Sequence, residues 1–169
     1  TDYEYTEAEG WFDAPFAINP LTPNVPTTIS KQIPTPNAFI AGPDAKVELK
    51  VIGQSNFANA PINHHLIIQF PENHIDTLYS GYKTIHIQRN IPVIKLGNTN
   101  THFSFTLPND LGITADRNAL SYIEIKYPHT TNLNNNNKFG FSTPLFSGSK
   151  STLEISNLNI LANDSVIAY

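Results

Sequence analysis

Residues 46–52 read Lys-Val-Glu-Leu-Lys-Val-Ile, and the strict alternation of apolar and charged side chains in this stretch decides the fold. The alternation places Val47, Leu49 and Val51 on one face, and Glu48 with the two lysines on the other. A period of two with one water-facing side is typical of an antiparallel β-strand. We therefore predict a strand here whose apolar face lies in a core.

The same alternation recurs along the chain between turn residues. Strands are predicted at residues 62–70, 82–88, 101–107 and 121–127, with shorter ones at 138–143, 151–156 and 166–169, and at most one edge strand near 27–33. No segment has a sustained helical period of 3.6 residues. Short strands with frequent turns indicate an all-β fold, an antiparallel two-sheet β-sandwich of jelly-roll type.

The composition also favours strands and loops over helices. The chain has 169 residues, of which 40% are hydrophobic and only 14% charged, and it contains 13 Pro and 20 Asn. Pro and Asn are poor in helix interiors and favoured in turns. This length is typical of one domain. We place a lead-in segment at residues 1–15 and a single β-sandwich domain at 16–169.

Charge and hydropathy exclude two classes of partner. The formal net charge is −4 and no run of Lys or Arg occurs, so nucleic-acid binding is not expected. Apolar runs such as residues 66–68 are far shorter than the roughly 20 residues that a membrane-spanning helix needs. No direct membrane span is predicted.

The chain holds no Cys and no Met, and it begins at Thr1. Without Cys there is no disulfide, no thiolate metal site and no cysteine nucleophile within these residues. From the missing Met we expect a fragment of a longer polypeptide, with an adjacent domain as a partner.

Histidine is the first residue type that could bring chemistry. The adjacent pair His64 and His65 points to opposite faces of a strand, so it cannot chelate one ion without a bulge. The others fall on different predicted elements, at His74, His86, His102 and His129. Polar positions on the outer face of a sheet are the favoured interpretation for His86 and His102. No metal ligand is assigned, and a structural calcium ion is left open without assigned residues.

Catalytic motifs are absent from the sequence. Neither a nucleophile elbow nor a phosphate-binding glycine loop occurs. Glu48 and Glu124 are predicted to point outward, and their spacing does not mark them as a catalytic pair. We therefore assign no catalytic residue and do not expect an enzyme, although a hydrolase with a loop-borne site remains an alternative.

Aromatic residues are the candidates for binding. Sugar rings stack on exposed aromatic faces, and Tyr79 and Tyr82 flank a Ser-Gly turn where such a face could be presented. Trp11 and Phe12 lie side by side near the start of the chain. For this second pair a core or interdomain plug is the favoured interpretation.

Two stretches resemble a known family. Residues 9–16 read Glu-Gly-Trp-Phe-Asp-Ala-Pro-Phe, and residues 120–128 read Leu-Ser-Tyr-Ile-Glu-Ile-Lys-Tyr-Pro. Together, with a strand near 139–141 and another near 153–155, they are similar to the β-sandwich module preceding the caspase-like domain of gingipain-family cysteine peptidases, most like the PorU-type sortases of type IX secretion. This sequence departs from that pattern at Asp13, where the family has Gly, and at His129, where it has Arg.

The resemblance implies a non-catalytic module, because the catalytic Cys and His of that family lie in the peptidase domain. It also implies an extracellular or cell-surface location reached by outer-membrane export. The leading hypothesis is a peptidase-associated module that positions its neighbour and contacts proteins or glycans. The alternative from the binding class is a carbohydrate-binding or adhesion module.

Overall fold

The computed structural model describes residues 12–136, 140 and 154–159, and these residues contain eight strands. The strands are β1 (Phe16–Ala17), β2 (Thr27–Pro34), β3 (Ala45–Gly53), β4 (His64–Phe70), β5 (Asn73–Tyr79), β6 (Thr84–Ile91), β7 (Asn100–Leu107) and β8 (Arg117–Lys126). A single 3-10 turn, η1 (Val93–Lys95), follows β6. No helix of this described part is long and apolar enough to cross a membrane.

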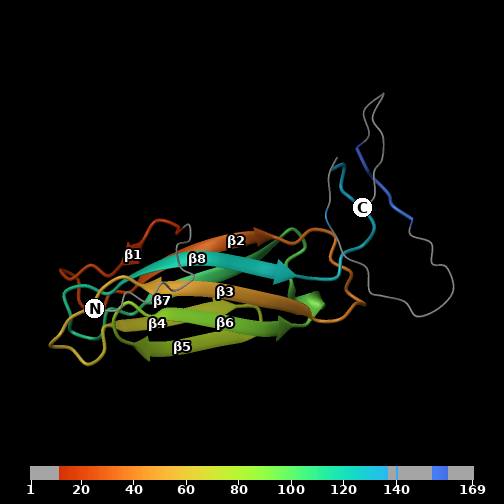
Figure 1. Cartoon of the computed structure of the whole chain (residues 1–169). Helices are drawn as coiled ribbons and strands as arrows, with labels where there is room; N and C mark the ends of the chain where they lie inside the picture. Colours follow the sequence, from red (N-terminus) through yellow and green to blue (C-terminus); the bar gives the residue numbers. More distant parts are fainter. Residues whose placement is uncertain (1–11, 137–139, 141–153, 160–169) are drawn as a thin grey trace, which may run out of the picture.

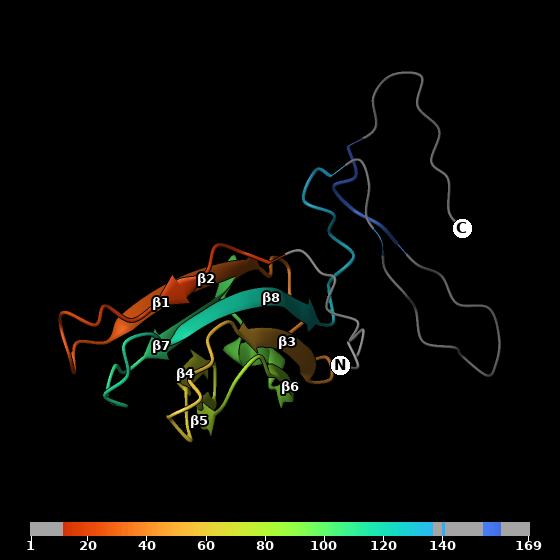
Figure 2. The same ribbon diagram turned by 60° about the vertical axis from the view of Figure 1, so that its left-hand side comes forward.

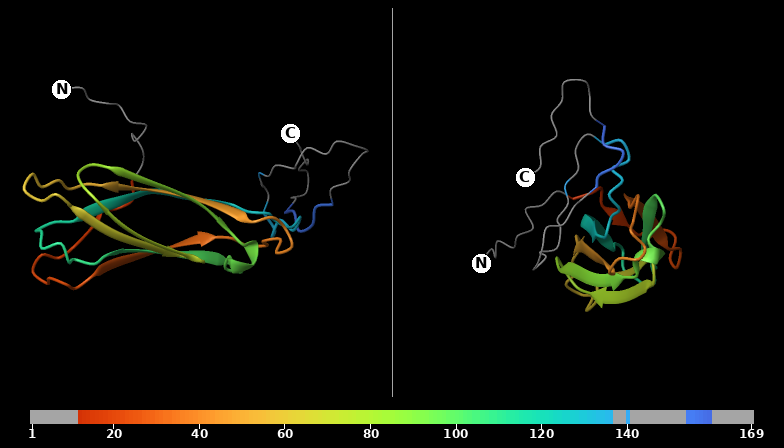
Figure 3. Two further views of the ribbon diagram at one scale, coloured as in Figure 1. Left: turned by 90° about the horizontal axis from the view of Figure 1, so that it is seen from below. Right: turned by 90° about the vertical axis from the view of Figure 1, so that its right-hand side faces the viewer.

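The strands form two four-stranded antiparallel sheets packed face to face (Figures 1 and 3). The strand order is β1-β8-β3-β6 in the first sheet and β2-β7-β4-β5 in the second. Strands that are successive in the chain mostly alternate between the sheets, which is the order of a jelly roll. The predicted sandwich is therefore confirmed, and β2 is the predicted edge strand.

The inner faces of both sheets meet in one core. Alternate residues of each strand point inward, as the period of two requires. The fully buried apolar side chains include Val47, Leu49 and Val51 from β3, Leu66 and Ile68 from β4, and Phe103 and Phe105 from β7. Because alternation positions these residues inward, their neighbours in sequence form the two outer faces.

A β-bulge in β8 decides which of its residues face outward. Lys50 of β3 lies opposite Tyr122, whereas the next residue, Val51, lies opposite Leu120, so Ser121 has no partner in β3. One extra residue reverses the alternation. Leu120 is consequently buried before the bulge, while Tyr122 points outward after it on the same face as Lys50. β8 curves strongly along its length in Figure 2.

Asparagine supplies most of the tight turns, which accounts for its abundance. Among the described residues other than glycine, those with positive φ are Asn24, Asn37, Glu72, Asn109, Asn134, Asn135 and Asn157. Asn tolerates this left-handed region better than other residues that carry a Cβ atom. The composition thus reflects turns rather than any repeated binding motif.

Two strands of the structure were not predicted, and three predicted strands lie wholly or partly outside the described residues. β5 was not predicted, and neither was the two-residue β1 beside β8. Of the predicted strand at 151–156, the described portion contains only a bridge between Ser156 and Asn132. The strand predicted at 166–169, and nearly all of the one at 138–143, lie outside the described residues.

Candidate functional site

The outer face of the first sheet carries a compact array of charged and polar side chains. We call it the charged face, and it consists of three cross-strand rows contributed by β6, β3 and β8. The rows are Asn90, Lys46 and Lys126; Gln88, Glu48 and Glu124; and His86, Lys50 and Tyr122. Register alone brings these residues together, because residues directly opposite on neighbouring strands have Cβ atoms about 4.5–5.5 Å apart.

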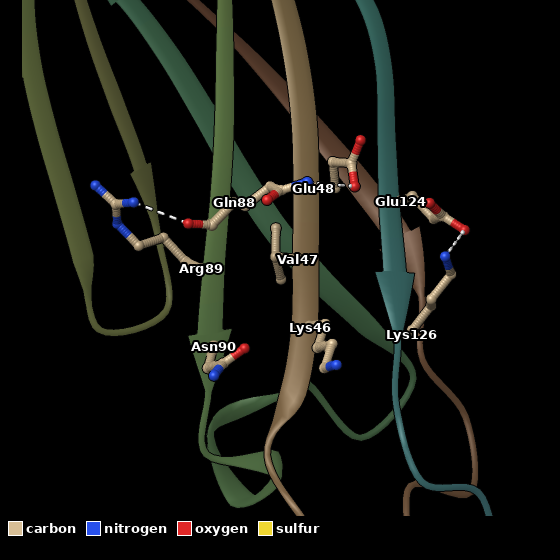
Figure 4. A pocket seen from close by; sticks show the side chains of 8 residues that line it. All are labelled: Lys46, Val47, Glu48, Gln88, Arg89, Asn90, Glu124 and Lys126. Carbon is tan, nitrogen blue, oxygen red and sulfur yellow. Dashed lines mark hydrogen bonds and ion pairs between the residues drawn. The ribbon is translucent and has the colours of Figure 1, made fainter.

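A shallow pocket of about 520 Å³ opens over the first two rows. Its lining is Lys46, Val47, Glu48, Gln88, Arg89, Asn90, Glu124 and Lys126. Figure 4 shows these side chains on the three strands, with Arg89 extending away from the others at the sheet edge. The pocket is therefore an open groove on a sheet surface.

Glu48 is the centre of a hydrogen-bond network on this face. Its carboxylate accepts hydrogen bonds from the Tyr122 hydroxyl at 2.6 Å, from His86 Nε2 at 2.8 Å and from Gln88 Nε2 at 3.0 Å. These donors, the Tyr122 hydroxyl first, lower the pKa of Glu48 to about 2. The carboxylate is thus ionised at every physiological pH and fixed in position.

Tyr122 is held by two contacts on the same face. Its hydrogen bond to Glu48 raises the pKa of its hydroxyl to about 12, so the hydroxyl remains a donor. The Lys50 ammonium lies 5.5 Å from the centre of the Tyr122 ring, a cation–π distance. The bulge at Ser121 is what places this ring outward beside Lys50.

Like charges face each other across β3 and β8. Lys46 lies opposite Lys126, and Glu48 lies opposite Glu124. Such pairs directly opposite on neighbouring strands destabilise a sheet. Part of the repulsion is relieved within β8, where Lys126 Nζ lies 3.2 Å from the Glu124 carboxylate. Because this arrangement does not stabilise the fold, we take it as an indication of function.

A second polar cluster is buried at one end of the core and serves the fold. His64 is fully buried, and its Nδ1 donates to Asp116 Oδ1 at 2.7 Å. Its Nε2 faces the carbonyl oxygens of Ser55 at 3.0 Å and Gly81 at 3.2 Å. The hydrogen-bonded pair is enclosed and offers no surface to a substrate.

Close packing around His64 explains a glycine in β3. A Cβ atom added at Gly53 would lie 2.6 Å from both His64 Nε2 and the Gly81 carbonyl oxygen. Glycine is needed here because the His64 ring and the loop at Gly81 approach the strand closely. The cluster therefore ties the end of β3 to β4 and to the turn before β6.

The two tyrosines predicted to bind a ligand, Tyr79 and Tyr82, differ in their exposure to solvent. Tyr79 is 5% exposed, stacks on His64 with ring centres 4.5 Å apart, and donates its hydroxyl hydrogen bond to Asn118. It has no free ring face for a ligand. Tyr82 is 75% exposed at the turn before β6, and its binding role stays a prediction.

The plug residues are only partly described. Phe12 is 40% exposed and so is not enclosed in the core of the described residues. Trp11 lies outside them. Whether the pair contacts a neighbouring domain stays a prediction.

The histidines follow the sequence interpretation in most respects. His64 points inward and His65 outward, as predicted for neighbours on a strand. His86 and His102 are exposed on the outer faces. Within the described residues, no three His, Asp or Glu side chains are grouped as a metal site.

Sequence reasoning named most members of the charged face singly but missed their convergence. Lys46, Glu48 and Lys50 were placed outward on their strand, and His86 and Glu124 were placed outward on theirs. Their network joins residues 38 and 74 positions apart, as in the hydrogen bonds from His86 and Tyr122 to Glu48. No local motif signals such a site, because strand register creates it.

Comparison with solved structures gives a distant likeness. No protein-family model matches the chain, and no curated protein matches it. It is similar to a solved structure, that of TmCBM61 in complex with β-1,4-galactotriose, with a TM-score of 0.39 and 11% identity, covering 67% of this chain and 68% of that one. The gingipain resemblance stays a prediction.

Proposed function

We propose that this protein is a non-catalytic carbohydrate-binding β-sandwich whose site is the charged face. One observation carries the proposal: Glu48 is an ionised carboxylate held in place by three donors on an open, grooved sheet. Holding a carboxylate in a network on the surface contributes little to the stability of the core. It does create a rigid acceptor for ligand hydroxyl groups.

The chemistry of the face suits a polyhydroxylated ligand. Carboxylates accept hydroxyl hydrogen bonds, and lysine ammonium and glutamine amide groups donate to ring and hydroxyl oxygens. Hydrogen bonds with one charged partner are stronger than those between neutral groups. Because Glu48, Gln88 and Tyr122 are already fixed by one another, binding costs less side-chain entropy.

The same groups are poorly suited to hydrolysis. A glycosidase needs a carboxylic acid that is protonated near neutral pH, which requires a raised pKa. The pKa of Glu48 is instead lowered to about 2 by Tyr122, His86 and Gln88. Glu48 therefore cannot be the acid of a pair with Glu124, and the face favours binding over catalysis.

The proposal extends to location and context, on the strength of the family resemblance in residues 9–16 and 120–128. The module belongs to a secreted or cell-surface protein and acts beside an adjacent domain of the same polypeptide. Protease treatment of intact cells, followed by immunoblotting, tests the location. Cleavage only after cell lysis would contradict it.

Binding is tested by affinity electrophoresis and calorimetry of the full chain with a panel of neutral and acidic polysaccharides. Gln88→Ala removes a donor from the charged face, and Gln69→Ala is the matched control on the outer face of the second sheet. We expect Gln88→Ala to weaken binding about tenfold, the equivalent of about 1.4 kcal/mol. Gln69→Ala should bind like the wild type. Equal loss in both variants, or no retained polysaccharide, would overturn the proposal.

A further inference from the structure

The row of Asn90, Lys46 and Lys126 differs from the rest of the charged face because two lysines face each other in it and only Lys126 has an acid partner. Lys46 and Lys126 are directly opposite on β3 and β8, and Asn90 flanks Lys46 on β6. The three side chains lie at one level across the strands in Figure 4. Among the described residues, no carboxylate forms an ion pair with Lys46.

Two other lysines among the described residues are paired with acids from distant parts of the chain. Lys31 pairs with Asp13, and Lys95 Nζ lies 2.8 Å from the Glu72 carboxylate. In a chain of net charge −4, two facing lysines with one acid neighbour concentrate positive charge locally. The row is therefore a positive patch within an acidic protein.

Neither carboxylate of the next row forms an ion pair with Lys46. Glu48 is adjacent in that row, but its carboxylate is held by donors from Tyr122, His86 and Gln88. The second carboxylate of that row, Glu124, already pairs with Lys126. Lys46 and the Asn90 amide remain as donors toward the groove that both line.

We propose that this row is a subsite for the carboxylate of an acidic sugar residue, so that the ligand of the charged face is an acidic polysaccharide. The inference rests on the proposed carbohydrate-binding function. An ammonium group has three N–H donors, so Lys126 can donate to a ligand carboxylate while it keeps its contact with Glu124. Lys46 and the Asn90 amide can donate to the same carboxylate. A sulfate ester has the same single negative charge, whereas the neighbouring Glu48 and Glu124 row repels a dianion. The carboxylate is the assignment, and sulfate is a separate arm of the test.

The test uses the full chain with polygalacturonate and its methyl ester, which share a backbone and differ in charge. We expect at least tenfold tighter binding of the acid form at low salt, weakening as salt screens the lysines. The double variant K46Q/K126Q should bind the acid form only as well as the ester. Lys83→Gln, an exposed lysine outside the row, is the control and should bind like the wild type.

The outcomes separate this inference from the proposed function. Equal binding of both polymers by the wild type leaves a carbohydrate-binding module but overturns the acidic subsite. Tighter binding of dextran sulfate than of polygalacturonate overturns the carboxylate assignment. If no polymer binds, the protein is titrated with free galacturonate and, separately, with free galactose. The backbone amide NMR signals of Lys46 and Lys126 report whether either sugar binds. Shifts with galacturonate alone uphold the subsite while the polysaccharide function fails, and no shifts overturn both.

The double variant K46Q/K126Q is expected to fold like the wild type. Removing two like charges that face each other relieves repulsion in the sheet. We therefore expect K46Q/K126Q to melt at the same temperature as the wild type or slightly above it. A loss of affinity at unchanged circular dichroism then reports the subsite.

Discussion

At the scale of single residues, Glu48 is the group whose state is best defined. Its pKa of about 2, against an ordinary value of 4.5, follows first from the Tyr122 hydroxyl and then from His86 and Gln88. A lowered pKa stabilises the fold above about pH 4.5, and this contribution is lost as the pH falls through about 2. We expect Tyr122→Phe to raise the Glu48 pKa, measured by NMR titration of the carboxyl carbon. An unchanged midpoint would show that the hydroxyl is not the main cause.

The buried pair of His64 and Asp116 leads to a prediction about the stability of the fold. Both side chains are nearly inaccessible, at 0% and 3% exposed. Removing one partner of a buried hydrogen bond leaves the other polar group unsatisfied and costs roughly 1–3 kcal/mol. We expect Asp116→Ala to lower the free energy of unfolding by about that amount in urea titrations.

The matched control for Asp116→Ala is Asp44→Ala, since Asp44 is exposed. A surface change of this kind should alter stability by less than about 0.5 kcal/mol. If Asp116→Ala does not fold, Asp116→Asn keeps the carbonyl oxygen that accepts from His64 and should fold with a smaller loss. Equal stability of the Asp116 and Asp44 variants would contradict a stabilising role for the buried hydrogen bond between His64 and Asp116.

At the scale of elements, His65 joins β4 to β5 and to the loop between β7 and β8. Its Nδ1 lies 2.8 Å from Asp110 Oδ1 and its Nε2 lies 2.9 Å from Asp76 Oδ1. Burial by itself would lower the pKa of His65, but the hydrogen bonds to Asp110 and Asp76 outweigh it and the pKa is raised. The protonated ring thus fastens the loop to the sheet.

A raised pKa fixes the sign of the pH dependence. The stabilisation by His65 is fully present below its ordinary value of 6.5 and is lost as the pH rises through the raised value. We expect the wild type to lose more stability than His65→Gln between about pH 5.5 and about pH 9 in urea titrations. His102→Gln, on the same outer face, should lose as much as the wild type. Parallel pH profiles for all three proteins would rule out the clamp.

The elements also show what sequence can and cannot predict. The alternation in residues 46–52 predicted β3 because its inward positions are all large and apolar. β5 was missed because Asn73 and Thr77 occupy two of its inward positions, and because the Pro71-Glu72 turn looked like the end of a strand rather than a tight hairpin. Edge strands need less apolar burial, so their pattern is weaker.

The charged face could be predicted only in part for a different reason. Alternation told which side chains of β3 point outward, but not which strands lie beside β3. The sheet order β8-β3-β6 joins segments from three distant parts of the chain. Without that order, Glu48 and Tyr122 were unrelated residues, and the facing lysines could not be seen as a pair.

At the scale of the whole molecule, the two sheets share one core and should unfold together. Leu49 in the first sheet and Phe105 in the second are both fully buried in that core. We expect Leu49→Ala and Phe105→Ala each to lower the free energy of unfolding by roughly 2–5 kcal/mol. Val25→Ala, at a position 55% exposed in a loop, is the control and should cost much less.

Hydrogen exchange measures whether the loss is shared. Protection of amides in β3 and β7 should fall by the same factor in either core variant, because opening one sheet exposes the inner face of the other. Loss confined to the mutated sheet would mean that the sheets are separate units.

The cross-strand rows give the side chains of the charged face two different spacings, one across the strands and one along them. Strands are about 4.8 Å apart, whereas rows repeat about every 6.8 Å along a strand. A chain lying across the strands meets one sign of charge from Lys46 to Lys126, but a chain lying along β3 meets Lys46, Glu48 and Lys50 in alternation. If the proposed polysaccharide ligand carries a charge on every unit, we expect it to lie across the strands, with its direction on the sheet set by its own charge spacing.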